Sequence, residues 1–180
     1  NNDSISVFNP DGNLLKVIES NELADGDDTG VAGLGLGTDD LLYLSKPWFG
    51  VVKVVNFDGS LADVFDVGGN PWAVDVSPIG NIYVTDSGTD LIHVLAPNGA
   101  VIRTITIGND ASLSDITVGN DGTVYAPYTN SDASSIAIIT AASEPSPDAT
   151  QFGDRIPGQP EGTENIGSPV VGTDVVYQAT

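Results

Sequence analysis

The chain has 180 residues, a formal net charge of −20 and five Lys and Arg residues in all, so it lacks the clustered cations that contact nucleic-acid phosphates or an anionic membrane surface. Its 40% hydrophobic content suffices for a packed core, and the absence of cysteine excludes disulfides and thiol chemistry. No apolar run is long enough for a transmembrane helix, so we expect no membrane insertion.

The first pattern along the chain is a hairpin. In residues 4–18, two aliphatic runs flank the turn sequence Asn-Pro-Asp-Gly at Asn9–Gly12. The same run and turn recur at Val54–Gly59 and Val94–Gly99, where they end the third strand of a longer repeat. We therefore predict that residues 1–20 form the third and fourth strands of one repeat unit, that is, half of it.

The repeat is clearest in residues 70–109, where four short β-branched or alternating segments are separated by turn residues. Residues 31–69 repeat the pattern with Tyr43 in the place of Tyr83, and residues 110–142 repeat it with Tyr125. A recurring four-stranded unit of about 40 residues is typical of a β-propeller blade. With 21 Gly, 11 Pro and no sustained helical period, the chain is predicted to be all-β.

The pattern breaks in residues 143–163, which are rich in Pro and Gly and predict an irregular insertion. Residues 164–180 then resemble the first half of a blade, with Tyr177 in the second strand. The chain is thus predicted to be one domain, residues 1–180, of about four blade equivalents. Two arrangements remain open. The terminal halves pair, within one chain or between chains, or the chain is part of a larger propeller.

The central repeat resembles the NHL family. The residues that carry the resemblance are Val74-Asp75-Val76, Gly80–Val84, Thr85-Asp86-Ser87, Ile92-His93-Val94 and Pro97-Asn98-Gly99. The other two repeats match less well, since Ser45-Lys46-Pro47 and Ala126-Pro127-Tyr128 replace the Thr-Asp-Ser element. The resemblance implies a β-propeller of four-stranded antiparallel blades. It implies no single function, because NHL-like propellers include ligand-binding scaffolds, lyases and lactonase-like enzymes.

No catalytic residue is predicted. His93, the single histidine, lies within a strand between Ile92 and Val94, at a position that the repeat fills with varied residues. Lactonase-like propellers hold a divalent ion on their axis, and the inner-strand acids here are Asp75 and Asp115. These two acids occupy different registers of the repeat, so we expect them to face different ways and identify no metal ligands.

Calcium is the one ion that the sequence leaves open. Asp25-Gly26-Asp27-Asp28 has the composition of a calcium loop but lacks the full ligand spacing and the terminal bidentate Glu. We therefore expect a solvated acidic loop and no cofactor. Asp86 and Asp90 are expected to brace the turn between the second and third strands of their repeat.

Trp48 and Trp72 are the predicted ligand-binding residues. Trp72 enters an inner strand after Pro71, and Trp48 lies in a strand connection between Pro47 and Phe49. Aromatic residues at strand ends can line the mouth of a ligand site or stack on sugar rings. The competing interpretation is packing between blades, which also requires large apolar side chains.

Taken together, the sequence favours a non-enzymatic β-propeller that acts as a binding or structural assembly module, located outside the cell or at its surface. The expected partners are a protein or carbohydrate ligand, or another copy that associates through the terminal strands. The alternative is a metal-dependent lactonase-like or lyase-like enzyme.

Overall fold

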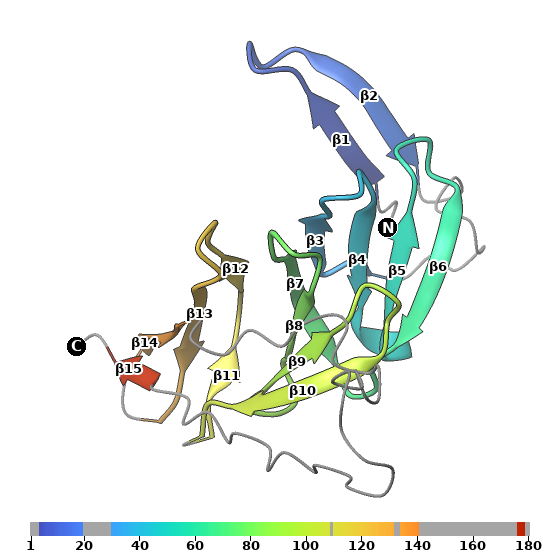
Figure 1. The fold of residues 1–180 in the computed structure, drawn as a ribbon. Helices are drawn as coiled ribbons and strands as arrows, with labels where there is room; N and C mark the ends of the chain where they lie inside the picture. Colours follow the sequence, from blue (N-terminus) through green and yellow to red (C-terminus); the bar gives the residue numbers. More distant parts are fainter. Residues whose placement is uncertain (1–3, 20–29, 109, 132–133, 141–175, 179–180) are drawn as a thin grey trace, which may run out of the picture.

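The computed structural model describes residues 4–19, 30–108, 110–131, 134–140 and 176–178, which form antiparallel sheets arranged side by side (Figure 1). The N-terminal hairpin consists of β1 (Ser4–Phe8) and β2 (Leu14–Glu19). The first blade consists of β3 (Gly33–Leu36), β4 (Leu42–Lys46), β5 (Val51–Val55) and β6 (Leu61–Asp66). A single 3-10 turn, η2 (Pro47–Phe49), joins β4 to β5.

The second blade consists of β7 (Pro71–Val76), β8 (Ile82–Asp86), β9 (Leu91–Leu95) and β10 (Val101–Thr106). The third blade consists of β11 (Ser112–Leu113), β12 (Thr117–Val118), β13 (Val124–Thr129), β14 (Ser134–Ile139) and β15 (Val176–Gln178). Both β11 and β12 pair with β13, so they are two pieces of one inner strand.

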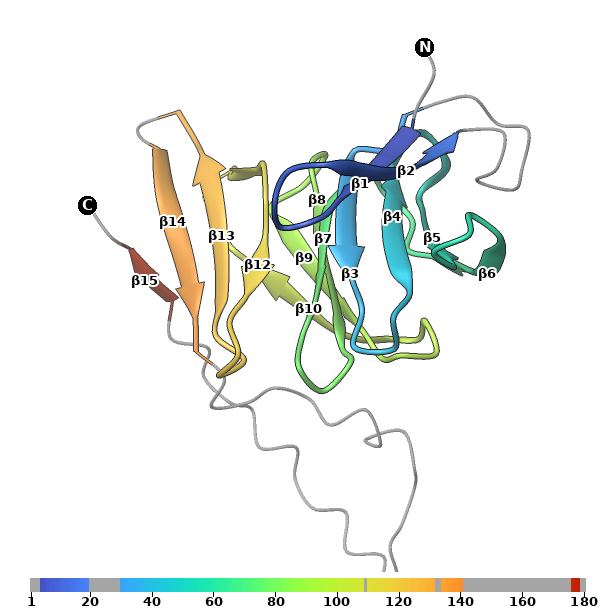
Figure 2. The same ribbon diagram turned by 90° about the horizontal axis from the view of Figure 1, so that it is seen from above.

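The strands within each blade follow one another in space as they do in sequence, and the inner strands β3, β7 and β12 face a common centre (Figure 1, Figure 2). This is the architecture of a β-propeller with four-stranded antiparallel blades, as predicted. The described blades form an open arc, with the N-terminal hairpin at one end and the third blade at the other (Figure 1). No helix among the described residues is long and apolar enough to cross a membrane.

Apolar side chains fill the spaces between neighbouring blades. One cluster, which includes Val52 and Leu95, lies between the first and second blades. A second, which includes Ile92 and Leu113, joins the second blade to the third. A third, smaller cluster around Ile18 packs the N-terminal hairpin on the first blade. Each blade is thus held by its neighbours, which is how a propeller buries both faces of every sheet.

The tyrosines that marked the repeat lie on equivalent second strands. Tyr43, Tyr83 and Tyr125 are on β4, β8 and β13, and each pairs with an inner strand. The inner-strand partners are Gly35, Asp75 and Thr117 in turn, which is the register expected from the sequence.

The C-terminal strand differs from the expectation. Val176–Gln178 was expected to lie in the second strand of a half-blade, which either pairs with the N-terminal half or belongs to a larger propeller. Instead, β15 pairs antiparallel with β14 and takes the fourth place of the third blade. The edge of β14 offers unpaired backbone groups that this strand satisfies. The predicted insertion at 143–163 and residues 164–175 lie outside the described residues.

Candidate functional site

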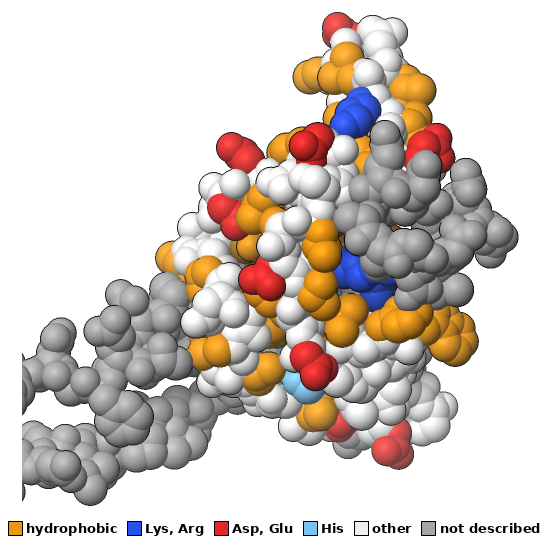
Figure 3. Space-filling model, turned by 90° about the vertical axis from the view of Figure 1, so that its right-hand side faces the viewer, with side chains coloured by type: hydrophobic (Ala, Val, Ile, Leu, Met, Phe, Trp, Pro, Cys, Tyr) orange, Lys and Arg blue, Asp and Glu red, His pale blue; other side chains and the backbone are white. Residues whose placement is uncertain are grey.

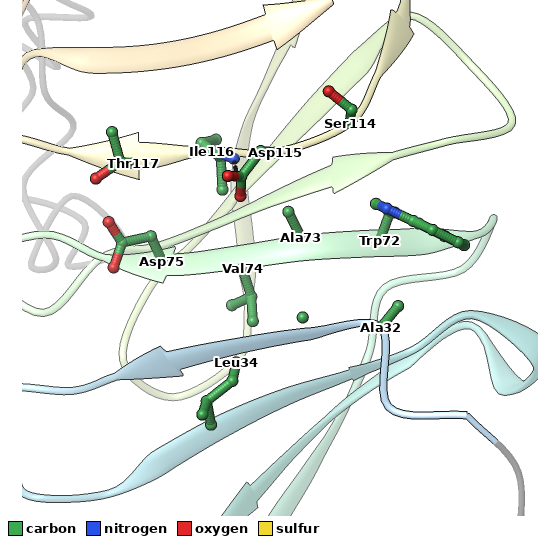
Figure 4. Close-up of a pocket in the computed structure, with 11 residues that line it drawn as sticks. Ala32, Leu34, Trp72, Ala73, Val74, Asp75, Ser114, Asp115, Ile116 and Thr117 are labelled. Atoms are coloured by element: carbon green, nitrogen blue, oxygen red, sulfur yellow. Dashed lines mark hydrogen bonds between the residues drawn. The ribbon is translucent and has the colours of Figure 1, made fainter. Parts of the chain in front are cut away.

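A pocket of about 340 Å³ lies where the inner strands of the three blades converge (Figure 4). Its walls come from the same few positions of each repeat. They are Ala32, Trp72 and Ser114, then Gly33, Ala73 and Asp115, then Leu34, Val74 and Ile116, and finally Asp75 and Thr117. Because equivalent positions of successive blades meet here, the pocket is a product of the repeat itself.

Irregular inner strands shape this pocket. In the second blade the register shifts between Pro71 and Val74, so that Trp72 and Ala73 lie opposite the single residue Thr85. Such a bulge bends the strand and turns a side chain out of the regular alternation. Trp72 is 43% exposed as a result, although it belongs to an inner strand between two blades.

The inner strand of the third blade has the same surplus of one residue over its second strand as the inner strand of the second blade, and at this point it is interrupted rather than bulged. Between β11 and β12, Ser114, Asp115 and Ile116 lie opposite only two residues of β13. Asp115 is exposed on this stretch, and its Oδ1 accepts a hydrogen bond from the Ile116 N–H at 2.9 Å. Figure 4 shows Asp115 in the middle of the pocket, with Trp72 at one end and Asp75 at the other.

Hydroxyl groups on the second strands hold the inner strands in place. Thr85 Oγ1 accepts a hydrogen bond from the Ala73 N–H at 3.0 Å. Ser45 Oγ accepts one from the Gly33 N–H at 2.7 Å and donates one to the Trp72 carbonyl at 2.5 Å. Ser45 therefore ties the first blade to the strand that carries the pocket tryptophan.

Glycine lets β3 approach β7 closely at the pocket wall. A Cβ added to Gly33 would lie 2.6 Å from the Trp72 carbonyl oxygen and 2.8 Å from the Ala73 Cα. Real Cβ atoms do not come so near to backbone atoms, so a larger residue here would push the strands apart.

Asp75 and Asp115 were expected to face different ways, but both line the pocket. Asp75 follows the bulge of β7 and Asp115 lies in the break between β11 and β12, so regular alternation along a strand does not decide where these two side chains point. They differ in what they bind, since Asp75 Oδ2 accepts a hydrogen bond from the Val118 N–H at 2.7 Å and so links β7 to β12.

A metal site does not emerge from the described part of the chain. Among these residues, no three His, Asp or Glu side chains gather closely enough to hold an ion. Asp25, Asp27 and Asp28, the acids of the candidate calcium loop, lie outside the described residues. Both carboxylate oxygens of Asp75 accept hydrogen bonds from backbone N–H groups, those of Val118 and Val76, so this side chain has a structural role.

The structure does not bring the two tryptophans into one pocket. Trp48 is 81% exposed on η2, and its indole lies beside Gly30 rather than in the pocket wall. The Ser45 hydroxyl, near the end of β4, donates a hydrogen bond to the Trp72 carbonyl, near the start of β7. Because Trp48 follows the end of β4, Trp48 and Trp72 lie at the same end of the propeller. Phe49, 47% exposed, extends the apolar surface beside Trp48.

His93 lies away from the pocket, on β9. Its Nε2 is 3.9 Å from Oδ2 of the buried Asp86. Asp86 Oδ1 accepts hydrogen bonds from the Asn70 and Gly88 N–H groups at 3.1 and 2.9 Å, so this aspartate braces its turn as expected. The pair is part of the second blade's framework.

Sequence reasoning missed most of the pocket. It identified Trp72 but not Ser114 or the wall residues Leu34 and Ile116. The repeat alignment contained this information, because Ser114 occupies the repeat position of Trp72, and Leu34 and Ile116 occupy that of Val74. The alignment could not predict the bulge that exposes Trp72.

No family model matches the sequence, and no curated protein matches it at a significant level. The fold is similar to solved β-propellers. Virginiamycin B lyase from Staphylococcus aureus superposes with a TM-score of 0.59 at 15% identity, covering 76% of this chain and 45% of that one. A catalytically inactive variant of the same lyase, solved with quinupristin, gives 0.59 at 21% identity, covering 78% and 46%.

The WD40 β-propeller domain of Doa1 is also similar, with a TM-score of 0.55, 15% identity, and coverage of 74% of this chain and 43% of that one. The chain thus spans less than half the length of these structures. Similarity at such low identity shows the fold, a β-propeller, and leaves the blade family and the activity to be argued from the residues.

Proposed function

We propose that this protein is a non-enzymatic binding module of the β-propeller class, with NHL-type blades, and that its ligand enters the inner-strand pocket. The observation that carries the proposal is the exposure of Trp72 on a bulge beside the exposed Asp115. The NHL-type assignment draws support from the second blade, where the Asn70 side chain donates to Ser87 Oγ at 2.6 Å and Asp86 binds the Asn70 N–H.

A carbohydrate suits the chemistry of this pocket. The volume of about 340 Å³ is at the lower end of small-ligand sites. An indole offers a flat apolar face for a sugar ring, and a carboxylate accepts hydrogen bonds from hydroxyl groups. Leu34, Val74 and Ile116 add an apolar wall. A protein ligand would instead cover the end of the propeller that carries Trp48 and Phe49.

Isothermal titration calorimetry with a panel of oligosaccharides tests this function, because it measures binding without using either tryptophan as the reporter. We expect saturable binding that the Trp72→Ala substitution abolishes and that Trp48→Ala, outside the pocket, leaves within about twofold. Equal loss in both variants would point to a protein-type surface over the end of the propeller. Binding that neither substitution affects would exclude the pocket as the ligand site.

The alternative function, a metal-dependent lyase-like or lactonase-like enzyme, draws support from the lyases among the structural neighbours. In the described pocket, Asp115 is the one carboxylate that is not bound to a neighbouring strand, so further ligands would have to come from residues outside it. Turnover of a lactone panel that is lost with a chelator would favour the enzyme over the binding module.

We also propose an extracellular or cell-surface location, supported by the net charge of −20. Such an acidic protein is suited to a cation-rich medium, where counterions screen its self-repulsion. Calcium is the proposed ion if one binds. Saturable thermal stabilisation by calcium at concentrations where sodium has no effect would establish it.

A further inference from the structure

The inner-strand pocket carries negative charge that no cationic side chain in its wall balances. Its lining residues include the two carboxylates Asp75 and Asp115 and no Lys, Arg or His. Figure 4 shows the Asp115 carboxylate in the middle of the pocket and Asp75 at one end. A concave site lined by one sign of charge attracts ligands of the opposite sign and repels those of its own. The pocket therefore disfavours an anionic ligand.

Asp115 has a carboxylate oxygen left for a ligand. Its Oδ1 accepts the hydrogen bond from the Ile116 N–H, whereas no group among the described residues donates one to its Oδ2. Asp115 is exposed because it lies in the break between β11 and β12. A ligand that fills the pocket covers this carboxylate and removes it from water.

Covering a carboxylate is unfavourable unless the ligand brings a compensating charge. A ligand hydroxyl compensates in part, since it donates one neutral hydrogen bond, whereas an ammonium group donates a stronger, charge-assisted one. Calcium takes about six to eight oxygen ligands, and no three His, Asp or Glu side chains of the described chain gather to supply them. The cation that suits a single free carboxylate oxygen is thus an ammonium group.

The opposite end of the pocket favours a ring. Trp72 is 43% exposed there, and its indole N–H donates to none of the described residues. An indole face packs against a flat ring and also attracts a positive charge carried beside that ring. The exposed Ser114 and Thr117 in the same wall add hydroxyl groups. The pocket thus combines a surface for a ring, hydroxyl groups that can bind other hydroxyls, and one acceptor for an ammonium group.

We propose that the ligand of this pocket is an amino sugar, with its ring on Trp72 and its protonated amine on Asp115. The proposal rests on the binding function proposed above and narrows the ligand from carbohydrates in general to positively charged ones. An amine on a flexible chain, such as a lysine side chain, offers the same charge but no ring for the indole. It should therefore bind less tightly than an amino sugar.

Isothermal titration calorimetry with two disaccharides of the same ring and linkage tests the proposal. The β-linked disaccharide of glucosamine carries an ammonium group at the second carbon of each ring, where cellobiose carries a hydroxyl. At physiological ionic strength we expect the glucosamine disaccharide to bind at least about tenfold more tightly than cellobiose. It should exceed the methylamide of acetyl-lysine, an amine without a sugar ring, by at least about as much. Trp72→Ala should weaken the binding of both disaccharides.

Asp115→Asn removes the charge and keeps an oxygen that can accept from the Ile116 N–H. It should weaken the glucosamine disaccharide by about tenfold or more and leave cellobiose within about twofold. Asp63→Asn is the matched control, because Asp63 is exposed on β6 and its Oδ1 accepts the Val64 N–H at 2.8 Å, outside the pocket. This variant should leave both affinities within about twofold, and thermal melts establish that each variant remains folded.

The control is needed because acidic side chains lie at several separate places on the surface, as the face in Figure 3 shows. A loss of glucosamine binding as large in Asp63→Asn as in Asp115→Asn would assign the preference to general surface charge and overturn the proposal. Tight binding of the lysine derivative would overturn the assignment to a sugar. Equal affinities for the two disaccharides, both lost in Trp72→Ala, would overturn the amino-sugar ligand and leave the pocket as a site for neutral sugars. Binding of no saccharide at all would overturn the proposed function, and this inference with it.

Discussion

The second and third blades carry different residues at the second-strand position that lies opposite the irregular part of the inner strand, and their inner strands differ as well. In the second blade β7 runs unbroken from Pro71 to Val76, with the Thr85 hydroxyl bound to the Ala73 N–H. In the third blade Pro127 stands where Thr85 would be, and the inner strand is split into β11 and β12.

Proline removes both a hydroxyl and a backbone donor from this position. What remains is its carbonyl, which accepts a hydrogen bond from the Ser114 N–H at 3.2 Å. The stretch from Ser114 to Ile116 therefore leaves the ladder, and this stretch exposes Asp115 to the pocket. From this comparison we infer that the residue at this second-strand position decides whether the inner strand is continuous or broken.

The largest expected effect comes from disrupting the close contact between the inner strands of the first and second blades, β3 and β7. Gly33→Val places side-chain atoms against the Trp72 carbonyl and the Ala73 Cα, which cannot swing aside. We expect a loss of about 3 kcal/mol in unfolding free energy, or roughly 6–12 °C in Tm. Leu36→Val, at an exposed position of the same strand, is the control and should change Tm little. An unchanged Tm for Gly33→Val would show that β3 does not contact β7.

The second prediction removes the hydrogen bond from the Ala73 N–H to the Thr85 hydroxyl, which holds the inner strand of the second blade. Thr85 is fully buried, and Thr85→Val keeps its shape while leaving the Ala73 N–H without its acceptor. An unsatisfied buried N–H costs about 1–3 kcal/mol, so the chemical denaturation midpoint should fall accordingly. Thr106→Val, exposed on β10, is the matched control and should stay within about 0.5 kcal/mol. An unchanged denaturation midpoint for Thr85→Val would mean that the backbone hydrogen bonds of β7 alone hold this strand in place.

Much of this fold follows from local patterns in the sequence. The turn sequences around Gly12, Gly59 and Gly99 and the spacing of the tyrosines predict the strands and their order, because each depends on neighbouring residues alone. The place of Val176–Gln178 did not follow. A short strand of this kind fits more than one free edge, and its choice of β14 depends on which edge the rest of the fold leaves open.

The pocket was predictable in part for the same reason. Trp72 stood out as an aromatic residue at the start of an inner strand, and it does line the pocket. The presence of both Asp75 and Asp115 in the pocket wall was missed because the comparison by repeat register assumed regular strands, whereas β7 is bulged and the inner strand of the third blade is broken beside Asp115. Trp48 looked equivalent by composition, but η2 directs it to the outside.

The third prediction gives the third blade the residue that the second blade has at the equivalent second-strand position, threonine in place of Pro127. Pro127→Thr restores a backbone donor and a hydroxyl opposite Ser114–Ile116, so hydrogen exchange of these residues should slow. The unfolding free energy should change by less than about 1 kcal/mol, since the new hydrogen bond is offset by the greater freedom of the unfolded chain. Pro78→Thr, in a turn of the second blade, should not alter exchange in this stretch. Unaltered exchange in Pro127→Thr would assign the break to Asp115 and its neighbours instead.

The smallest effect is expected at a turn, where the first blade departs from the other two. The turns between the first and second strands share one geometry, closed by hydrogen bonds of 2.8 Å from Gly37 to Leu41 and from Gly119 to Thr123. The left-handed position of the turn is glycine in the third blade, Gly122, and Asp40 in the first, at φ 78° and 61°. Asp39, not Asp40, makes the side-chain hydrogen bonds of that turn, to the Leu41 N–H and the Tyr43 hydroxyl.

Asp40→Gly should therefore relieve backbone strain without losing a contact, and we expect a gain of about 0.5 kcal/mol after the entropy of the added glycine is counted. The reciprocal change, Gly122→Asp, should cost about 1 kcal/mol, because it introduces the same strain into the third blade. Thermal melts of the two single variants and the double variant measure both effects, and additivity is expected since the turns belong to different blades. A lower Tm for Asp40→Gly would mean that Asp40 contributes an interaction that outweighs its strained backbone.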